Sequence, residues 1–161
     1  MDDLDPRIYR KQMHRQESAT IARFITFSCN HRLPLLGNPR IADLFVSLLS
    51  EARTRHGMKL YAWVVMPEHV HLLVKAAGAP WSTIAQFIKT GVSKRVINRW
   101  RKLGPVAAPF LSAIKSDDTY RFWLPGGGFD RRLRTTNAMA REIRYVHRNP
   151  VERELATKPE D

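Results

Sequence analysis

The sequence is poor in cysteine and in long apolar runs. One cysteine in 161 residues, Cys29, excludes an internal disulfide framework and a cysteine-rich zinc site. No apolar run approaches the roughly 18 to 20 residues that a membrane-spanning helix needs. The first residues, MDDLDPRIYRKQ, are charged and have no apolar segment behind them, so we expect no signal peptide. We therefore expect a cytoplasmic protein that makes no use of a membrane.

Acidic residues are also scarce. The chain has 27 Lys and Arg against 15 Asp and Glu, a net charge of +12 and a pI near 10.6. Seven of the acidic residues lie close to the two ends, namely Asp2, Asp3, Asp5, Glu152, Glu154, Glu160 and Asp161. The body of the chain is thus more basic than the total suggests, and an excess of this size favours a polyanionic partner, above all nucleic acid.

The first half of the chain shows clear secondary-structure patterns. Residues 19–30 are rich in Ile, Phe and Thr and predict a strand. Asn38 as N-cap and Pro39 as first helical residue predict a helix that ends at Gly57. Residues 60–67 and 69–76 read as two strands, and the Pro67-Glu68 connection is short enough to require a tight antiparallel turn.

The second half combines two amphipathic helices with weaker signals. Pro80 opens a helix with apolar residues every three or four positions, which ends at Gly104. Residues 105–119 form a poorly patterned connector. Two short strands or arms are expected in 120–133, around the Gly126–Gly128 run. A last helix is expected to begin near Thr136 and to end before Pro150.

This element order predicts an α+β fold of the ferredoxin-like sandwich type, with an antiparallel sheet and helices on one of its faces. Residues 19–156 would form a single domain. A polar N-terminal segment, 1–18, and a short tail, 157–161, would lie outside it.

Two histidines stand one residue apart in the apolar stretch WVVMPEHVHLLV (residues 63–74). Alternate residues of a strand point to the same side, so His69 and His71 project together while Val70 and Leu72 face the core. Two imidazoles in this arrangement could hold one cation. They could equally be satisfied or solvated histidines on an open sheet face, and the pattern alone leaves both interpretations open.

The surrounding residues resemble a known family. The stretch around His69 and His71 is similar to the His-hydrophobic-His strand of the single-tyrosine HUH transposases of small insertion sequences. REIRYVHRNPVEREL (141–155) is similar to the tyrosine helix of the same family, and RFITFSC and IAQFIKTGVSKRVINRW also fit. The chain most resembles the REP-associated tyrosine transposases over roughly residues 20 to 156.

This resemblance implies a metal-dependent endonuclease and strand transferase that acts on single-stranded or hairpin DNA, including repetitive extragenic DNA. Tyr145, on a C-terminal catalytic helix, would be the nucleophile that forms a 5′-phosphotyrosine. His69, His71 and Asn149 would bind Mg²⁺ or Mn²⁺. Tyr145 and Asn149 are four residues apart, which places both on one face of a helix. Relatives act as monomers or as homodimers, and the resemblance leaves that choice open.

Several basic and aromatic residues are candidates for DNA binding. Trp123, beside Arg121, is a candidate for stacking on bases. Glu68 could orient a neighbouring imidazole, but we interpret it as the polar residue of the tight turn. The remaining candidates are Lys89, Lys94, Arg95 and Arg99 on the second expected helix and Arg131, Arg132 and Arg134 before the last one.

A second function remains compatible with the sequence. A domesticated, non-catalytic protein could use the same sheet to bind single-stranded nucleic acid.

Overall fold

The structure, a computed structural model, describes residues 21–126 and 128–158. The expected segment 1–18 and the end of the expected tail, 159–161, lie outside the described residues. The strands are β1 (Ala22–Ser28), β2 (Lys59–Val65), β3 (His69–Lys75), β4 (Lys115–Ser116), β5 (Thr119–Tyr120) and β6 (Phe129–Leu133). The helices are α1 (Pro39–His56), α2 (Trp81–Leu103), α3 (Ala108–Ala113) and α4 (Thr136–Glu152), with 3-10 turns at Asn30–Arg32, Leu35–Gly37 and Gly104–Ala107.

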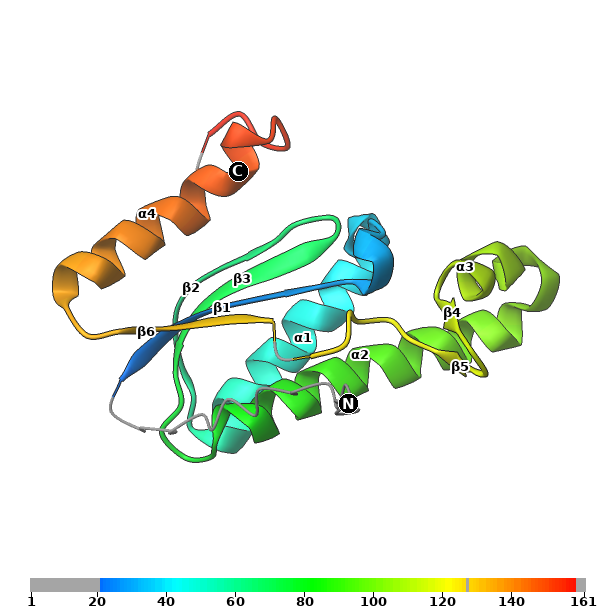
Figure 1. The fold of residues 1–161 in the computed structure, drawn as a ribbon, viewed down its shortest axis with the longest axis horizontal. Coiled ribbons are helices and arrows are strands. Elements are labelled where there is room, and N and C mark those ends of the chain that lie inside the picture. Colours follow the sequence, from blue (N-terminus) through cyan, green and yellow to red (C-terminus); the bar gives the residue numbers. More distant parts are fainter. Residues whose placement is uncertain (1–20, 127, 159–161) are drawn as a thin grey trace, which may run out of the picture.

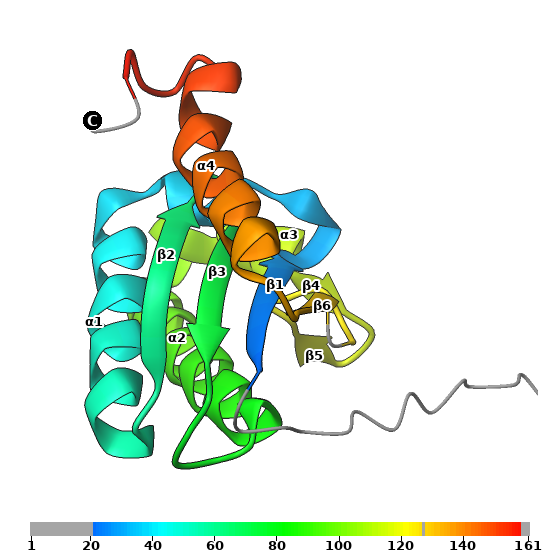
Figure 2. The ribbon, with the colours of Figure 1, turned by 90° about the vertical axis from the view of Figure 1, so that its left-hand side faces the viewer.

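A four-stranded antiparallel sheet in the order β2-β3-β1-β6 organises the molecule. Helices α1 and α2 cover one face of this sheet, and α4 crosses the opposite face (Figures 1 and 2). With β6 as the fourth strand, this is the predicted ferredoxin-like α+β sandwich, and the prediction of the fold class is confirmed. The second sheet, β4-β5, lies with α3 at the end of α2.

The ends of α1 lie where their capping residues predict. The Asn38 side chain accepts a hydrogen bond from the Arg40 N–H at 3.0 Å, and Pro39 occupies the first turn, where no N–H partner is needed. Gly57 ends the helix in the left-handed region at φ 59°, and its N–H bonds to the Arg53 carbonyl. The sequence therefore determines both ends of α1 locally.

The two faces of the sheet bury apolar clusters of different sizes. The larger cluster lies between the sheet and α1 and α2 and includes Val70 and Leu72, as the alternation in β3 predicts. The smaller cluster lies under α4, where Val146 packs on residues such as Phe24 and Leu73. His69 and His71 alternate with Val70 and Leu72, so they face the side that α4 crosses.

Two expectations are wrong. The last helix does not end before Pro150 but continues through it to Glu152. Pro150 removes one intrahelical hydrogen bond, but it lies in the last turn, and only Val151 and Glu152 follow it in the helix. Glu154, just beyond the end, has a φ of 56°. The connector 105–119 contains a helix, α3, whose Phe110 stacks on Trp100 of α2. No apolar periodicity signals so short a helix.

No helix within the described ranges is long and apolar enough to cross a membrane.

Candidate metal and nucleophile site

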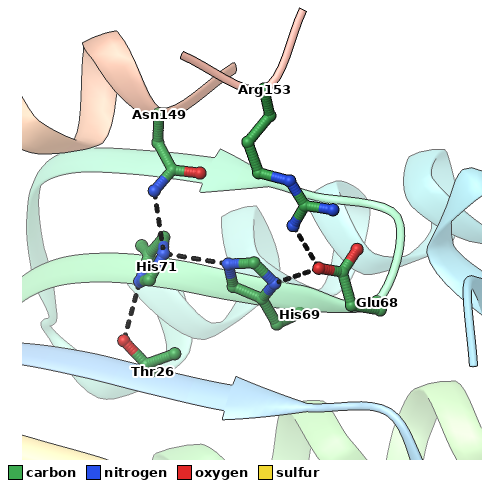
Figure 3. Close-up of polar contacts among 6 residues, drawn as sticks. All are labelled: Thr26, Glu68, His69, His71, Asn149 and Arg153. Atoms are coloured by element: carbon green, nitrogen blue, oxygen red, sulfur yellow. Dashed lines mark hydrogen bonds and ion pairs between the residues drawn. The ribbon is translucent and has the colours of Figure 1, made fainter. Parts of the chain in front are cut away.

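The site is built on β3, on the sheet face that α4 crosses. His69 and His71 are both buried, and their Nε2 atoms lie 2.9 Å apart (Figure 3). The flanking apolar residues anchor β3 in the core, so the two rings are held by a rigid element. Each imidazole therefore directs one nitrogen toward a shared point.

The other nitrogen of each ring is occupied. Thr26, on β1 directly opposite His71, places its hydroxyl oxygen 2.7 Å from His71 Nδ1. The Glu68 carboxylate lies 3.1 Å from His69 Nδ1. A carboxylate can only accept, so His69 carries its proton on Nδ1 and presents a lone pair at Nε2. Thr26 can accept in the same way from His71. This assignment, inferred from the network, leaves two facing lone pairs, an arrangement that a cation would stabilise.

Asn149 approaches the same point from α4. Its Nδ2 lies 3.4 Å from His71 Nε2, and the residue is 8% exposed. Its Oδ1 is buried and has no hydrogen-bond partner among the described residues. Most buried side-chain oxygens have such a partner, so this one calls for an explanation. The amide nitrogen is the atom that faces His71 (Figure 3). With the amide turned so that Oδ1 takes its place, two imidazole nitrogens and an amide oxygen would be a donor set that fits a divalent ion such as Mg²⁺ or Mn²⁺.

Within residues 21–126 and 128–158, no group of three or more His, Cys, Asp or Glu side chains is arranged so that it could hold a metal ion by itself. The site on β3 and α4 has two such side chains, His69 and His71, and its third member is an amide.

Burial keeps both imidazoles neutral. It lowers the pKa of His71 to about 4, and a proton on neighbouring His69 would repel one on His71 and so act in the same direction. Burial also lowers the pKa of His69, although the Glu68 carboxylate opposes that shift. For Glu68, burial would raise the pKa, but hydrogen bonds from Arg153 and the backbone, together with His69, lower it overall. The site thus holds an ionised carboxylate beside two neutral imidazoles, the protonation states that metal binding requires.

Glu68 does more than form the turn, contrary to our interpretation of the sequence. Its Oε1 also forms an ion pair with Arg153, just beyond the end of α4. The carboxylate therefore orients His69 and at the same time joins the β2–β3 turn to the helix that carries Asn149 (Figure 3).

Tyr145 lies one helical turn before Asn149. Its ring is 5.3 Å from that of His71 and 5.8 Å from that of Phe24, measured between centroids. The residue is nevertheless 42% exposed. The helix thus places an accessible phenol beside the buried histidines, as the four-residue spacing predicts.

Comparison of the sequence with models of known protein families identifies the family of the chain. The model of IS200-like transposases matches residues 18–106, more than half of the chain. The chain belongs to the IS200-like transposase family. The resemblance seen in the motifs is thereby confirmed for the family, although Tyr145 and Asn149 lie beyond the matched segment. A search of curated protein sequences found no match.

Two solved structures share the fold of this IS200-like chain. One is a REP-associated tyrosine transposase bound to a REP hairpin, with a TM-score of 0.66 and 17% identity over 99% of this chain and 78% of the other. The second is a transposase candidate from Deinococcus radiodurans R1, with a TM-score of 0.50 and 19% identity over 92% of this chain and 97% of the other. At these identities the likeness concerns the fold.

The expected DNA-binding residues do not form one surface around the histidines. Trp123 is 7% exposed, packs against Phe27 and Phe122, and donates its indole N–H to the Lys89 carbonyl. It is a core residue, so its assignment as a stacking platform is wrong. Arg121 beside it remains exposed.

Lys89, Lys94, Arg95 and Arg99 lie on α2, which covers the sheet face opposite the histidines. Arg131 pairs with Phe24 of β1, so it lies on the sheet face that carries His69 and His71, which we call the histidine face. It also forms an ion pair with Glu142 of α4. Arg132 points to the other face. Arg134 lies exposed in the connection to α4.

Sequence reasoning missed several residues that shape the site. Thr26 and Phe24 lie on β1, and nothing in a strand pattern shows which residue of a distant strand will face His71. Arg153 follows α4 at the position four residues after Asn149, and this spacing was a signal available in the sequence.

Proposed function

We propose that this transposase is a metal-dependent endonuclease and strand transferase for single-stranded DNA, with Tyr145 as nucleophile. The observation that carries the proposal is the convergence of His69 Nε2, His71 Nε2 and the Asn149 amide, whose oxygen is unsatisfied, within one helical turn of an accessible tyrosine. Any one of these features is common in proteins, but together they fit one reaction class.

His69, His71 and Asn149 would hold a divalent ion, Mg²⁺ or Mn²⁺. When bound, this ion would supply Lewis-acid stabilisation of negative charge on the phosphate oxygens. Glu68 and Thr26 orient the two imidazoles from behind and fix their tautomers, which is the ordinary role of such partners around a metal-binding histidine.

The Tyr145 hydroxyl attacks the phosphorus of a phosphodiester in this proposal. A bond from the phenol oxygen to phosphorus forms as the bond to the 3′ oxygen breaks. The phenol loses its proton, the departing 3′ oxygen gains one, and the downstream strand remains as a 5′-phosphotyrosine. A free DNA 3′-OH can later attack this ester and release Tyr145, so strands are rejoined without a nucleotide cofactor.

The DNA partner is proposed to be a hairpin with single-stranded flanks. The structural neighbour bound to a REP hairpin supports this choice. Arg131 and Arg134 are the expected basic residues nearest to α4 and the histidine face. Lys89, Lys94, Arg95, Arg99, Arg121 and Arg132 would contact DNA only where it extends beyond that face.

The test is a covalent-adduct assay with a hairpin oligonucleotide labelled at its 5′ or 3′ end, Mg²⁺ or Mn²⁺, and a denaturing gel. On this gel, the unmutated protein should remain covalently attached to the labelled downstream fragment. Tyr145→Phe removes only a hydroxyl and should abolish the adduct, while DNA binding stays within a few-fold. Tyr61→Phe is a matched control, since Tyr61 is also 42% exposed, and it should form the adduct normally.

An adduct formed by the Tyr145→Phe protein would show that another residue is the nucleophile. Binding of the hairpin without any adduct from the unmutated protein would overturn catalysis and favour the non-catalytic binding function.

A further inference from the structure

Phe129, the first residue of β6, is a large apolar side chain left exposed on the histidine face. It is 53% exposed. It pairs across the sheet with Thr26, and Thr26 in turn pairs with His71. Residues directly opposite one another in antiparallel strands project to the same side, so Phe129, Thr26 and His71 share one face.

Phe24 connects Phe129 to the candidate site. The Phe24 ring stacks on His71 with centroids 5.4 Å apart and meets the ring of Tyr145 at 5.8 Å. Its contact with Phe129 is edge-to-face at 6.2 Å. One ring therefore separates Phe129 from both the expected nucleophile and an expected metal ligand.

Gly128 holds the Phe129 backbone close to β1. Its φ is 67°, and a Cβ atom on this residue would lie 2.1 Å from the carbonyl oxygen of Thr26. Only glycine permits this approach. The backbone next to Phe129 is therefore held against Thr26, whose hydroxyl contacts His71, while the Phe129 side chain is exposed.

Isolated exposed apolar residues are ordinary, and Phe129 could simply cover Phe24. A cover for Phe24 needs apolar volume but no flat ring. A stacking platform needs the flat ring, a rigid backbone and a position beside the reacting groups, and Phe129 has all three. Exposed aromatic rings on a sheet are a common means of binding unpaired bases.

We infer that Phe129 forms a nucleobase subsite, on which an unpaired base next to the attacked phosphate stacks. The inference deepens the proposed function and rests on it for the identity of the ligand as single-stranded DNA. Its role is to position the strand, with Tyr145 and the histidines performing the chemistry.

The experiment measures binding by fluorescence anisotropy in the Tyr145→Phe background, which prevents covalent capture. Two labelled hairpins are compared, one with single-stranded thymidine flanks and one with abasic flanks of equal length and charge. Phe129→Ala and Phe129→Leu should each weaken binding of the thymidine probe by at least about fivefold, the lower end of what stacking of one base contributes. Binding of the abasic probe should not change, and Phe129→Trp should restore affinity for the thymidine probe.

Phe110→Ala is the matched control. Phe110 is 52% exposed but lies on α3, at the other end of the molecule from α4, so neither probe should be affected (Figure 1). Wild-type affinity of the Phe129→Leu protein for the thymidine probe would overturn the inference, because leucine keeps the cover over Phe24. An equal loss on both probes would overturn it as well, since that result indicates structural damage.

The outcome is separable from that of the adduct assay. A Phe129-dependent preference for the thymidine probe without any adduct would refute catalysis and keep the subsite. The unmutated protein could instead form the adduct normally while the Tyr145→Phe protein, with Phe129 in place, binds both probes equally. That result would refute the subsite and leave the proposed catalysis standing.

Discussion

Glu68 and Arg153 form an ion pair that ties the β2–β3 turn to the end of α4. The same carboxylate oxygen contacts His69 Nδ1 at 3.1 Å. Arg153 lies four residues after Asn149, which lies four residues after Tyr145, so the pair fixes the end of the helix that carries both. One carboxylate therefore connects an expected metal ligand on the sheet with the expected ligand and nucleophile on the helix.

Replacing Glu68 should weaken the metal site. Glu68→Leu removes the acceptor for His69 Nδ1, and changes of this kind typically cost about 10- to 100-fold in metal affinity or activity. Glu68→Gln keeps an oxygen acceptor and should lose less. Mn²⁺ affinity, measured by calorimetry, is the readout. Glu152→Leu is the control, because it removes an exposed ion pair with Arg148, and both of these residues lie on α4. Equal affinities for Glu68→Leu and the unmutated protein would refute this role.

The sequence predicted those parts of the fold that local rules determine. The ends of α1, the alternation in β3 and the Tyr145–Asn149 spacing depend on neighbouring residues only, and the structure shows each of them as expected. The antiparallel sheet could also be predicted from the order of the elements, because that order allows few sheet topologies.

The misassigned residues depend on tertiary contacts. Trp123 was interpreted as a candidate for stacking on bases because it stands beside Arg121, but its ring packs against Phe27 in the core. Phe129 and Thr26 gain their importance from register between strands that are distant in sequence. Glu68 shows the same limit, since its ion-pair partner lies 85 residues further along the chain.

The buried ion pair between Arg23 and Asp130 should be important for stability. The two side chains are 4% and 6% exposed, lie 2.8 Å apart and join β1 to β6. Asp130→Ala leaves the buried guanidinium without this carboxylate and should lower the free energy of unfolding by about 3 kcal/mol. Urea denaturation provides the measurement. Glu51→Ala, which removes an exposed pair with Arg55, should change stability by less than about 0.5 kcal/mol. Similar small effects for both variants would contradict the prediction.

Cys29 should be unreactive in the folded protein. Burial raises the pKa of its thiol to about 12, despite backbone hydrogen bonds that act in the opposite direction. Because the thiolate is the reactive form, a disulfide reagent at pH 8 should modify the native protein far more slowly than the urea-unfolded chain. The single cysteine makes the count of modified thiols unambiguous. Rapid modification under native conditions would show that β1 opens at its end.

The histidines and Asn149 should differ in how strongly their loss impairs the reaction. His69→Ala or His71→Ala removes a nitrogen ligand from a rigid strand and should abolish adduct formation, while much of the affinity for hairpin DNA remains. Contacts with phosphates generally dominate the affinity of proteins for DNA, and these substitutions remove no Lys or Arg side chain. Asn149→Ala should be milder, because water can occupy the place of one amide oxygen, and Asn149→Asp should retain the reaction, since carboxylate oxygen suits Mg²⁺. Adduct yield is followed as Mn²⁺ is added to metal-free protein. Undiminished adduct formation in excess EDTA would exclude the metal assignment, and an Asn149→Ala defect equal to that of the histidine variants would show that the amide is as necessary as the imidazoles.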